Sequence, residues 1–415
     1  MKTSGYQYWR FVVVIDVVVV LLCLWPALLL AGGQASLSLP AVVQQVLTQH
    51  PLPQAAEAHV EASRGLTRQA GAYPNPTFAF EDNDPSRELT YLLKQPLEWP
   101  FKRTYRIGVA TANAHIAERE QEGVHQDLIA AAREGFFRVL VAEESQRIAQ
   151  TFVATIVRLH DSVAQRFAAG DVPEFEVTKA RVELIRATTD RKKVEGQLVT
   201  ARASLNLLLG NSETTPLALD GSLAVRQTVP AFEDLVARAD EQNPQLRAQQ
   251  RVVEREQLNL KLAWASLVPD LEIDFAKRDN NLSPRVSGPI VGLSFSVPLW
   301  DHKEGAIAAA RRTVEEAEAR LRTTRLQLRQ ALLIAYRTWE TATEQVDAYT
   351  AGVLTQAEEA AALAERSYRE GEGDLLGVLD ARRSLLTVRR DYTQALFDQD
   401  LAWVAIEHAA GIATE

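Results

Sequence analysis

Cysteine is nearly absent from this chain of 415 residues: the only one, Cys23, lies close to the N-terminus. If that end is removed on export, the mature protein has no cysteine, and no disulfide can stabilise it. Cys23 follows Leu22. A lipoprotein site needs a small residue in that place, so we do not expect lipidation of Cys23.

Other absences exclude several classes of function. No region is strongly basic with interleaved aromatic residues, which argues against nucleic acid as a partner. The seven histidines form no H-x-x-x-H pair and no cluster with cysteine, so the sequence predicts neither a metal site nor a cofactor. No catalytic set of residues is visible, and we do not expect an enzyme. Beyond the N-terminal segment, no run of 18 apolar residues occurs.

The N-terminal segment has the pattern of an export signal. Lys2 and Arg10 give it a positive start, and residues 17–31 are uncharged and mostly aliphatic. Small residues then precede Ala35, where we place the cleavage site, so residues 1–35 are predicted to be a signal peptide. The alternative is an uncleaved anchor, because the apolar run is almost long enough to span a bilayer.

The rest of the chain contains one plan twice. The stretches "RFAAGDVPEFEVTKARVEL" and "SYREGEGDLLGVLDARRSL" align without a gap at an offset of 201 residues, so that Gly170 meets Gly371 and Gly210 meets Gly411. Each copy has a helix broken before a proline, two strand-like pieces, a long helix, a glycine turn and a second long helix. The predicted segments are a signal peptide (1–35), a first repeat (36–210), a connector (211–230), a second repeat (231–411) and a C-terminal tail (412–415).

The strand-like pieces alternate apolar and polar residues with period 2. They cover residues 77–81 and 89–99 in the first copy, and 271–275 and 291–300 in the second. A strand of about 9–11 residues with one apolar face and one small-polar face is suited to crossing a membrane. The alternative is a small sheet packed against the helices.

If these strands enter a membrane, some of their residues have expected places in it. Apolar positions on the last strand are expected to face lipid, and aromatic residues at the strand ends are expected at the membrane interface. The lipid-facing set is Val291, Leu293, Phe295 and Val297, and the interface set is Tyr73, Trp99 and Trp300.

The long helices are expected over residues 102–168 and 302–369, which contain no proline. At 1.5 Å per residue, each makes a rod of roughly 100 Å. Apolar residues in the second rod recur every seven positions, with small residues between them, so neighbouring helices can approach closely. This seam consists of Ile307, Val314, Leu321, Leu328 and Ala335, with Ala310, Ala317, Thr324 and Ala331 beside it. An ordinary coiled-coil hairpin is the alternative use of this pattern.

Four strands cannot close a barrel, and an open sheet edge in lipid would leave backbone groups unpaired. Three chains together supply twelve strands, a number within the range of outer-membrane barrels. We therefore predict a mainly α fold with a small transmembrane β part. In it, periplasmic coiled-coil helices form an α-barrel, and the four strands of each chain contribute to a trimeric 12-stranded β-barrel.

Several of these motifs resemble the TolC family of outer-membrane efflux channels. They are "AYPNPTFAFE" and "SLVPDLEIDF" where the strands begin, "PLEW" and "PLW" where they end, and "GEGDLLGVLDARRSLL" after the second glycine turn. The resemblance covers essentially all of the mature chain. It implies a homotrimer in the outer membrane of a Gram-negative bacterium, in contact with lipid and with a long periplasmic part.

The resemblance also implies a role for the two glycine turns. In the family they are the tips of helical hairpins that ring the periplasmic entrance of the tube and meet an adaptor (membrane fusion) protein. Here the tips contain Gly170, Asp171, Glu370 and Gly371. The two glycines permit the positive φ that such chain reversals need.

An acidic pore entrance is the next expectation. Family members often carry D-V-L-D-A after the second tip, with both acids facing the pore. This chain has Gly377 in the first acidic position, so only Asp380 carries over, and the nearby Glu372 and Asp374 are candidates to complete the ring. A cation-selective entrance is predicted; the alternative is that these acids are solvated turn residues.

The function implied is that of the exit duct of a tripartite efflux pump. It would passively conduct what an inner-membrane resistance-nodulation-division transporter and its adaptor deliver. "QPLEWPFKR" resembles the CzcC-like branch, which serves heavy-metal export, although that branch usually has glycine where this chain has Phe101. One rival is an outer-membrane channel for type I protein secretion. Another is a soluble periplasmic coiled-coil scaffold.

Overall fold

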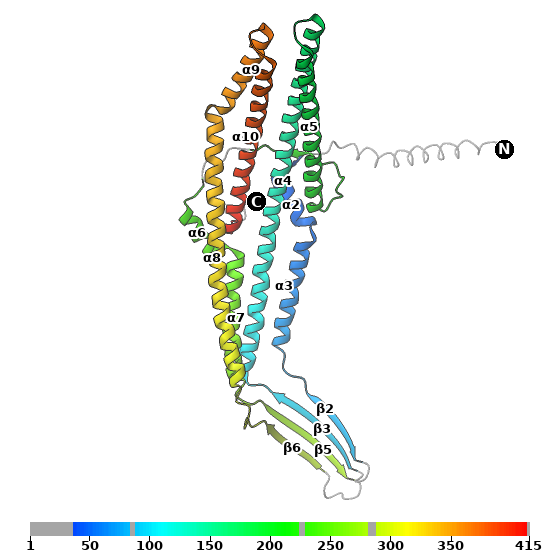
Figure 1. Cartoon of the computed structure of the whole chain (residues 1–415). Helices are drawn as coiled ribbons and strands as arrows, with labels where there is room; N and C mark the ends of the chain where they lie inside the picture. Colours follow the sequence, from blue (N-terminus) through cyan, green and yellow to red (C-terminus); the bar gives the residue numbers. More distant parts are fainter. Residues whose placement is uncertain (1–35, 84–87, 224–228, 281–287, 413–415) are drawn as a thin grey trace, which may run out of the picture.

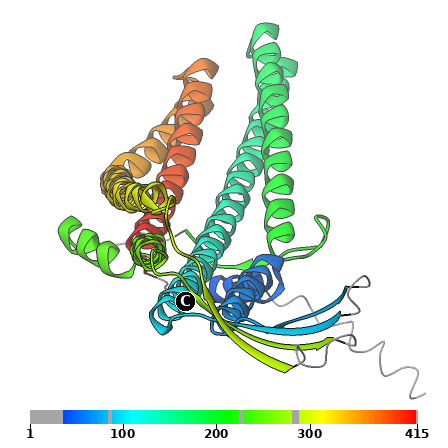
Figure 2. The same cartoon turned by 90° about the horizontal axis from the view of Figure 1, so that it is seen from below.

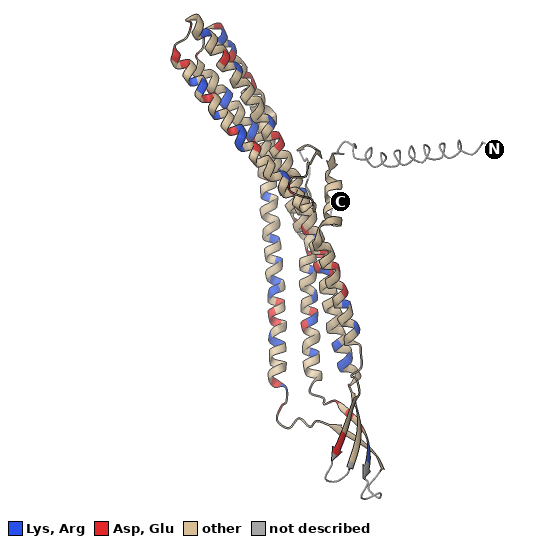
Figure 3. Ribbon diagram, turned by 90° about the vertical axis from the view of Figure 1, so that its right-hand side faces the viewer, with Lys and Arg blue, Asp and Glu red and all other residues tan. Residues whose placement is uncertain are grey.

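The computed structural model of the protein describes residues 36–83, 88–223, 229–280 and 288–412. The predicted signal peptide therefore lies outside the described residues, as do the centres of both strand-connecting turns, part of the connector and the end of the predicted tail. The molecule is long and narrow, with a sheet at one end and two helical hairpins at the other (Figure 1). Charged residues of both signs are spread along its helices (Figure 3).

Two similar series of elements follow each other along the chain. The first is α2 (Leu39–Gln49), α3 (Pro51–Ala70), β2 (Thr77–Asn83), β3 (Glu88–Leu97), α4 (Pro100–Ala169) and α5 (Glu174–Leu208). The second is α6 (Phe232–Gln242), α7 (Pro244–Ala265), β5 (Leu271–Asn280), β6 (Gly288–Phe295), α8 (Glu304–Ala348), α9 (Leu354–Glu370) and α10 (Leu375–Ala410). Two short parallel strands, β1 (Leu37–Ser38) and β4 (Leu219–Asp220), pair near the middle of the molecule.

Each series opens with a helix broken before a proline, as predicted. Proline fits the first turn of a helix, where its missing N–H has no partner to lose. The residue before each proline caps the new helix: His50 Nδ1 accepts the N–H of Leu52 at 3.2 Å, and Asn243 Oδ1 accepts that of Leu246 at 3.2 Å.

The long helix of the first series is unbroken, but the prediction of one continuous helix over 302–369 is wrong. Between α8 and α9 lies a π-helical segment, Tyr349–Val353, in which Gly352 has φ 158° and ψ −20°. Glycine has little preference for the helical conformation, so the helix breaks most easily at Gly352. The predicted heptad seam is buried or half-buried from Ile307 to Leu328, but Ala331 is exposed and Leu332 takes its place.

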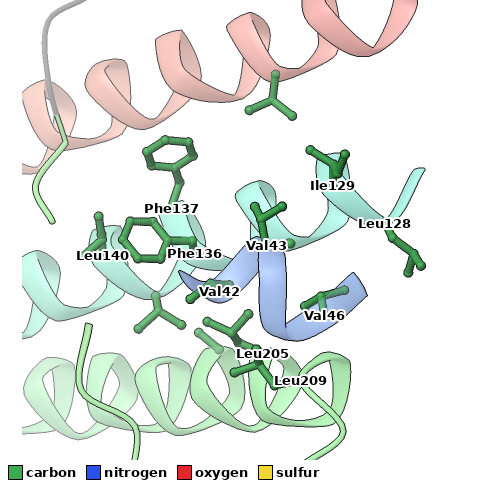
Figure 4. Close-up of a cluster of buried hydrophobic side chains, with 14 of the residues drawn as sticks. Val42, Val43, Val46, Leu128, Ile129, Phe136, Phe137, Leu140, Leu205 and Leu209 are labelled. Carbon is green, nitrogen blue, oxygen red and sulfur yellow. The ribbon is translucent and has the colours of Figure 1, made fainter. Parts of the chain in front are cut away.

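The main core lies where α2 inserts beside α4 and α5. Val42, Val43 and Val46 of α2 pack against Phe136 of α4 and Leu205 of α5 (Figure 4). All five side chains are at most 5% exposed. Burying each valine stabilises the fold by about 1.5–3 kcal/mol, which fixes α2 in the middle of the molecule.

The end of α10 approaches the start of α7 very closely. Gly411 has φ 74°, and a Cβ added there would lie 2.7 Å from the backbone nitrogen of Asn243. The Asn243 amide also donates a hydrogen bond to the carbonyl of Ala409 at 3.2 Å. Glycine is therefore required at position 411 for both its conformation and its size.

The four long strands form one antiparallel sheet in the order β2-β3-β5-β6, so β3 and β5 join the two series. The sheet projects beyond the ends of the helices, which do not cover its faces (Figures 1 and 2). This arrangement overturns the alternative of a small sheet packed on helices.

All four long strands differ from the prediction at one or both ends: β2 and β5 continue to Asn83 and Asn280, and β6 begins at Gly288. β6 ends at Phe295, because Pro298 has no N–H for a ladder and the N–H of Leu299 turns back to the carbonyl of Val297 at 2.9 Å. Val297 and Trp300 thus lie beyond the strand. β3 ends at Leu97, and Trp99 is the N-cap residue of α4. None of the described helices combines the length and the apolar character needed to cross a membrane.

Candidate functional site

The sheet has one apolar face, built by cross-strand rows. Phe78 of β2 is opposite Leu93 of β3, which is opposite Phe275 of β5, which is opposite Val291 of β6. These four residues, in the same order, are 67%, 39%, 47% and 70% exposed. We call the following residues the apolar sheet face: Phe78, Phe80, Leu93, Phe275, Val291, Leu293 and Phe295. A contiguous exposed apolar surface of this kind marks contact with a membrane or a partner.

Near the helices, the opposite face of the sheet carries polar and charged side chains, whereas Leu92, Ala276 and Ile290 lie on the same face nearer the strand-connecting turns. Lys94 of β3 pairs with Glu272 of β5 at 3.3 Å, and Ser294 of β6 donates a hydrogen bond to Asp274 at 3.2 Å. Side chains on a strand alternate between the two faces, so the same strands supply both surfaces. An apolar outside and a polar inside are the requirements of a strand in a membrane barrel.

The predicted interface aromatics lie at the junction of sheet and helices. Tyr73 and Trp300 are 68% and 90% exposed, as side chains at a membrane interface would be. The guanidinium of Arg103 lies 4.5 Å from the centre of the Tyr73 ring. Trp99 is half-buried, and its indole N–H donates to the carbonyl of Pro269 at 2.8 Å, so this residue also ties α4 to the start of β5.

Basic residues at the start of α4 hold this junction together. Lys102 is only 7% exposed and pairs with Asp270 at 2.8 Å. Arg103 donates to the carbonyl of Gly71 at 3.0 Å, on the segment that leads into β2. Sequence reasoning used Lys102 and Arg103 only as marks of a family branch and missed this role. The signal available was two adjacent basic residues in the first turn of the helix that follows a strand.

The two hairpin tips share one backbone geometry. Gly170 has φ 88° and Gly371 has φ 80°, so the predicted positive φ is confirmed at both. After each glycine, the next residue donates its N–H to the carbonyl five positions earlier, at 2.9 Å in both tips. This pattern ends a helix by satisfying its last carbonyls. Asp171 and Glu370 are exposed beside the glycines.

Tyr368, near the end of α9, joins the second tip to the first. Its hydroxyl donates to Glu176 of α5 at 2.8 Å, and its carbonyl accepts from Arg166 of α4 at 3.1 Å. The guanidinium of Arg166 also lies 4.7 Å from the ring centre. Burial, followed by the bond to Glu176, raises the pKa of Tyr368 to about 12. This contact between hairpins could not be read from the sequence.

The three predicted entrance acids occupy different positions. Asp374 is the N-cap of α10, where its Oδ1 accepts the N–H of Gly377 at 2.9 Å. Asp380 is exposed six residues further on, with Arg383 at 3.7 Å. Glu372 is exposed in the turn itself. Asp374 therefore has a structural task at the helix start, whereas Asp380 and Glu372 present their carboxylates to solvent.

Two arginines of α10 reach across to α5. Arg383 binds both carboxylate oxygens of Glu183, with Nε 2.9 Å from Oε1, and Arg390 pairs with Asp190 at 3.0 Å. Glu183 is only 4% exposed. The bond to Glu183 is the main cause of the raised pKa of Arg383. Sequence reasoning missed these pairs, although both arginines and both acids are seven residues apart in their helices.

Histidines and acids meet in pairs rather than in larger groups. His408 is 2.7 Å from Asp127, and His115 is 3.0 Å from Glu118. Within residues 36–83, 88–223, 229–280 and 288–412, no three His, Cys, Asp or Glu side chains are placed to hold a metal ion.

The sequence matches the family described as outer membrane efflux protein over residues 42–211 and 235–412. Together these two stretches make up most of the chain. The chain belongs to the outer membrane efflux protein family. The predicted fold class and localisation are confirmed: an outer membrane efflux protein with long periplasmic helices and a β part. The family comprises channel proteins rather than enzymes.

Individual relatives support this assignment. This chain is 28% identical to the cobalt-zinc-cadmium resistance protein CzcC of Cupriavidus metallidurans, over 86% of each chain. It is 27% identical to the nickel-cobalt-cadmium resistance protein NccC of Alcaligenes xylosoxydans xylosoxydans, over 74% of this chain and 72% of that one. Its fold is similar to that of the outer-membrane channel OprN, with a TM-score of 0.80 at 20% identity over 90% of each chain.

Proposed function

We propose that three copies of this chain form the outer-membrane exit duct of a tripartite efflux pump, and that the duct passively conducts divalent heavy-metal cations. The observation that carries the proposal is the sheet. It has an apolar face, a polar face and two outer strands, β2 and β6, each of which pairs on one side only among the described residues.

The open sheet edges support the trimer. An unpaired edge in hydrocarbon leaves backbone N–H and C=O groups without partners, which is strongly unfavourable. If β6 of one copy pairs with β2 of the next, three copies close a barrel of twelve strands. The apolar sheet face would then contact lipid, and Lys94, Glu272 and Asp274 would line the lumen.

The helices support the same closure. Val182, Ile185 and Val199 of α5 are 45%, 59% and 64% exposed, and Leu326 and Leu333 of α8 are 69% and 43% exposed. Such side chains on the two outer helices of one chain gain stability when a neighbouring copy covers them. Closing the ring in this way makes a periplasmic tube continuous with the barrel.

The two tips support docking of a periplasmic adaptor. They share the geometry of Gly170 and Gly371, so three chains would present six similar turns to an adaptor ring. The exposed Asp171 and Glu370 beside the turns are the proposed adaptor contacts. Asp380, Asp374 and Glu372 are proposed to give the entrance its preference for cations, and an inner-membrane resistance-nodulation-division transporter would supply the substrate.

The substrate class rests on the relatives named for cobalt, zinc, cadmium and nickel resistance. Weak contacts that an ion can leave are sufficient for conduction, so a duct does not need a tight metal site. Type I protein secretion stays the second candidate, because the same duct could serve a polypeptide exporter.

Two measurements test the proposal. Light scattering of protein extracted from outer membranes, corrected for detergent, should give the mass of three chains; a monomer would contradict the duct. A deletion strain should lose tolerance to Co²⁺, Zn²⁺ and Cd²⁺ and regain it with the intact gene. Unchanged metal tolerance together with loss of a secreted protein would favour type I secretion instead.

A further inference from the structure

One row of residues interrupts the polar face of the sheet. Ala79 of β2 is opposite Leu92 of β3, which is opposite Ala276 of β5, which is opposite Ile290 of β6. We call these four residues the inner apolar row. Ile290 is 48% exposed, and the other three are half-buried. The inner apolar row departs from the small-polar face that the sequence predicts.

The rows on both sides of the inner apolar row contain charged residues. The row on the helix side consists of Thr77, Lys94, Asp274 and Gly292, and the row on the turn side consists of Glu81, Thr90, Arg278 and Gly288. Residues two apart on a strand share a face and lie about 7 Å apart along it. A narrow apolar band thus lies between two charged rows.

Asp274 places a negative charge beside the inner apolar row. The other acid nearby, Glu272, pairs with Lys94 at 3.3 Å. Asp274 Oδ2 accepts the hydroxyl of Ser294 at 3.2 Å, whereas Oδ1 is shielded from solvent and has no hydrogen-bond partner within the residues that the structure describes. Opposite Asp274 on β6 is Gly292, which has no side chain to cover the carboxylate. The charge of Asp274 is therefore only partly compensated.

An apolar row beside such a carboxylate suits a ligand that is both apolar and cationic. Apolar groups of the ligand leave water favourably when they are buried against Leu92 and Ile290. Its positive charge is attracted by Asp274. A butyl chain covers most of the distance of about 7 Å between the two rows, but a methyl group does not. A hydrated metal ion gains nothing from the apolar row, because leaving its water is costly.

We propose that the inner apolar row and Asp274 form a binding site for amphipathic organic cations on the wall of the barrel lumen. The site rests on the proposed function, because this face lines a lumen only if three copies close the barrel. It gives the duct a second class of ligand in addition to the divalent metal ions of the proposed function. By symmetry, three copies would carry three such sites at one height in the barrel.

Thiol modification tests the site, because Cys23 is the only cysteine of the sequence and falls in the predicted signal peptide. Ala276→Cys places one thiol in the inner apolar row. With the full chain in lipid nanodiscs, a charged, membrane-impermeant methanethiosulfonate reagent should modify this thiol from the lumen. Tetrabutylammonium should slow the modification. Tetramethylammonium at the same concentration is the control for charge and should have little effect.

The expected difference between the two ions follows from the buried alkyl surface. One butyl arm has three more CH₂ groups than a methyl group, and the wall of the lumen covers about half of that arm. Tetrabutylammonium should therefore bind roughly tenfold more tightly than tetramethylammonium. The concentration that halves the modification rate measures this ratio.

Two neighbouring leucines of β3 give a matched pair of variants. Leu92 belongs to the inner apolar row, and Leu93 belongs to the apolar sheet face. In the Ala276→Cys background, Leu92→Ser should weaken the protection by tetrabutylammonium about fivefold, and Leu93→Ser should leave it unchanged. Asp274→Asn keeps an oxygen for the hydroxyl of Ser294 but removes the charge, and should weaken the protection about threefold or more.

Three results would overturn the site. The first is an equal rate of modification in tetrabutylammonium and tetramethylammonium. The second is protection that is the same in Leu92→Ser and Asp274→Asn as in the Ala276→Cys parent. The third is a thiol at position 276 that the reagent never modifies, because the inner apolar row would then not face water.

Failure of the proposed function would look different. Phe275→Cys puts its thiol on the apolar sheet face, which lipid covers in the proposed barrel. If the reagent modifies Phe275→Cys as fast as Ala276→Cys, lipid does not cover that face, and the duct is contradicted; the protection measurement still decides whether the inner apolar row binds. If only Ala276→Cys reacts and tetrabutylammonium does not protect it, the duct stands and the site fails.

Discussion

The hydroxyl of Tyr368 donates a hydrogen bond of 2.8 Å to the carboxylate of Glu176, 192 residues earlier in the chain. The tyrosine is 3% exposed and belongs to the second hairpin, whereas the glutamate belongs to the first. One side chain therefore joins two elements that are far apart in sequence, at the end of the molecule where an adaptor is proposed to dock.

Removing only this hydroxyl should loosen the tips. Tyr368→Phe keeps the buried ring beside Arg166 but takes away a hydrogen bond to a charged group, which is worth about 2 kcal/mol. Amide hydrogens at the end of α9 should then exchange about 30-fold faster, as measured by mass spectrometry. Glu176→Gln keeps an accepting oxygen without the charge and should have a smaller effect. Equal exchange in the parent and in Tyr368→Phe would contradict the contact.

The pKa of Tyr368 predicts how this contact depends on pH. Burial, then the bond to Glu176, raise the pKa from 10.0 to about 12, while the charge of Arg166 lowers it. Because the folded pKa is the higher one, the stabilisation is complete below pH 10 and is lost as the pH rises through about 12. Burial also raises the pKa of Tyr349, so absorbance at 295 nm should show one late-ionising tyrosine fewer in Tyr368→Phe than in the parent. Identical titration curves of the parent and Tyr368→Phe above pH 10 would contradict the raised pKa of Tyr368.

The buried Glu183 should make Arg383 important for stability. Arg383→Ala leaves a carboxylate that is 4% exposed without its two-point partner. We expect a loss of about 3 kcal/mol, seen as a lower midpoint of thermal unfolding by circular dichroism. Arg390→Ala is the control, because its partner Asp190 is 48% exposed at the side chain, unlike the buried Glu183, and such a pair is worth about 0.5 kcal/mol. A similar loss of stability in Arg383→Ala and Arg390→Ala would contradict the larger contribution of the pair with the buried Glu183.

On β6, substitution by arginine should impair membrane insertion at Leu293 but not at the neighbouring Ser294. Leu293 belongs to the apolar sheet face, and Ser294 points to the polar face. An arginine facing lipid near the bilayer centre costs about 2–4 kcal/mol, whereas a polar lumen tolerates it. Leu293→Arg should therefore reduce the amount of protein recovered in the outer-membrane fraction, and Ser294→Arg should not. Equal recovery of the two variants would argue that the apolar sheet face does not meet lipid.

The sequence was most informative where a residue's role depends on its near neighbours. Period-2 alternation predicted all four long strands, the X-Pro pairs predicted the helix breaks, and Gly170 and Gly371 predicted the turns. Contacts between distant segments were not predictable in the same way. Glu176 and Tyr368, or Glu183 and Arg383, meet only because two hairpins lie side by side. The break at Gly352 was missed because one glycine in a long helical pattern is usually tolerated.

Charge reversal should separate the roles of the predicted entrance acids. Asp380 is exposed and caps no helix, so Asp380→Lys should lower cation selectivity in planar-bilayer recordings without a change in thermal stability. Asp374 caps α10, so Asp374→Lys should lower selectivity and also remove about 1 kcal/mol of stability. Asp374→Asn keeps a capping oxygen without the charge, so it should have the stability of the parent but the lowered cation selectivity of Asp374→Lys.

If cation selectivity is the same in all three variants as in the parent, these acids do not line the entrance. Stability that falls equally in Asp374→Asn and Asp374→Lys would show that the charge, and not the cap, matters at this helix start.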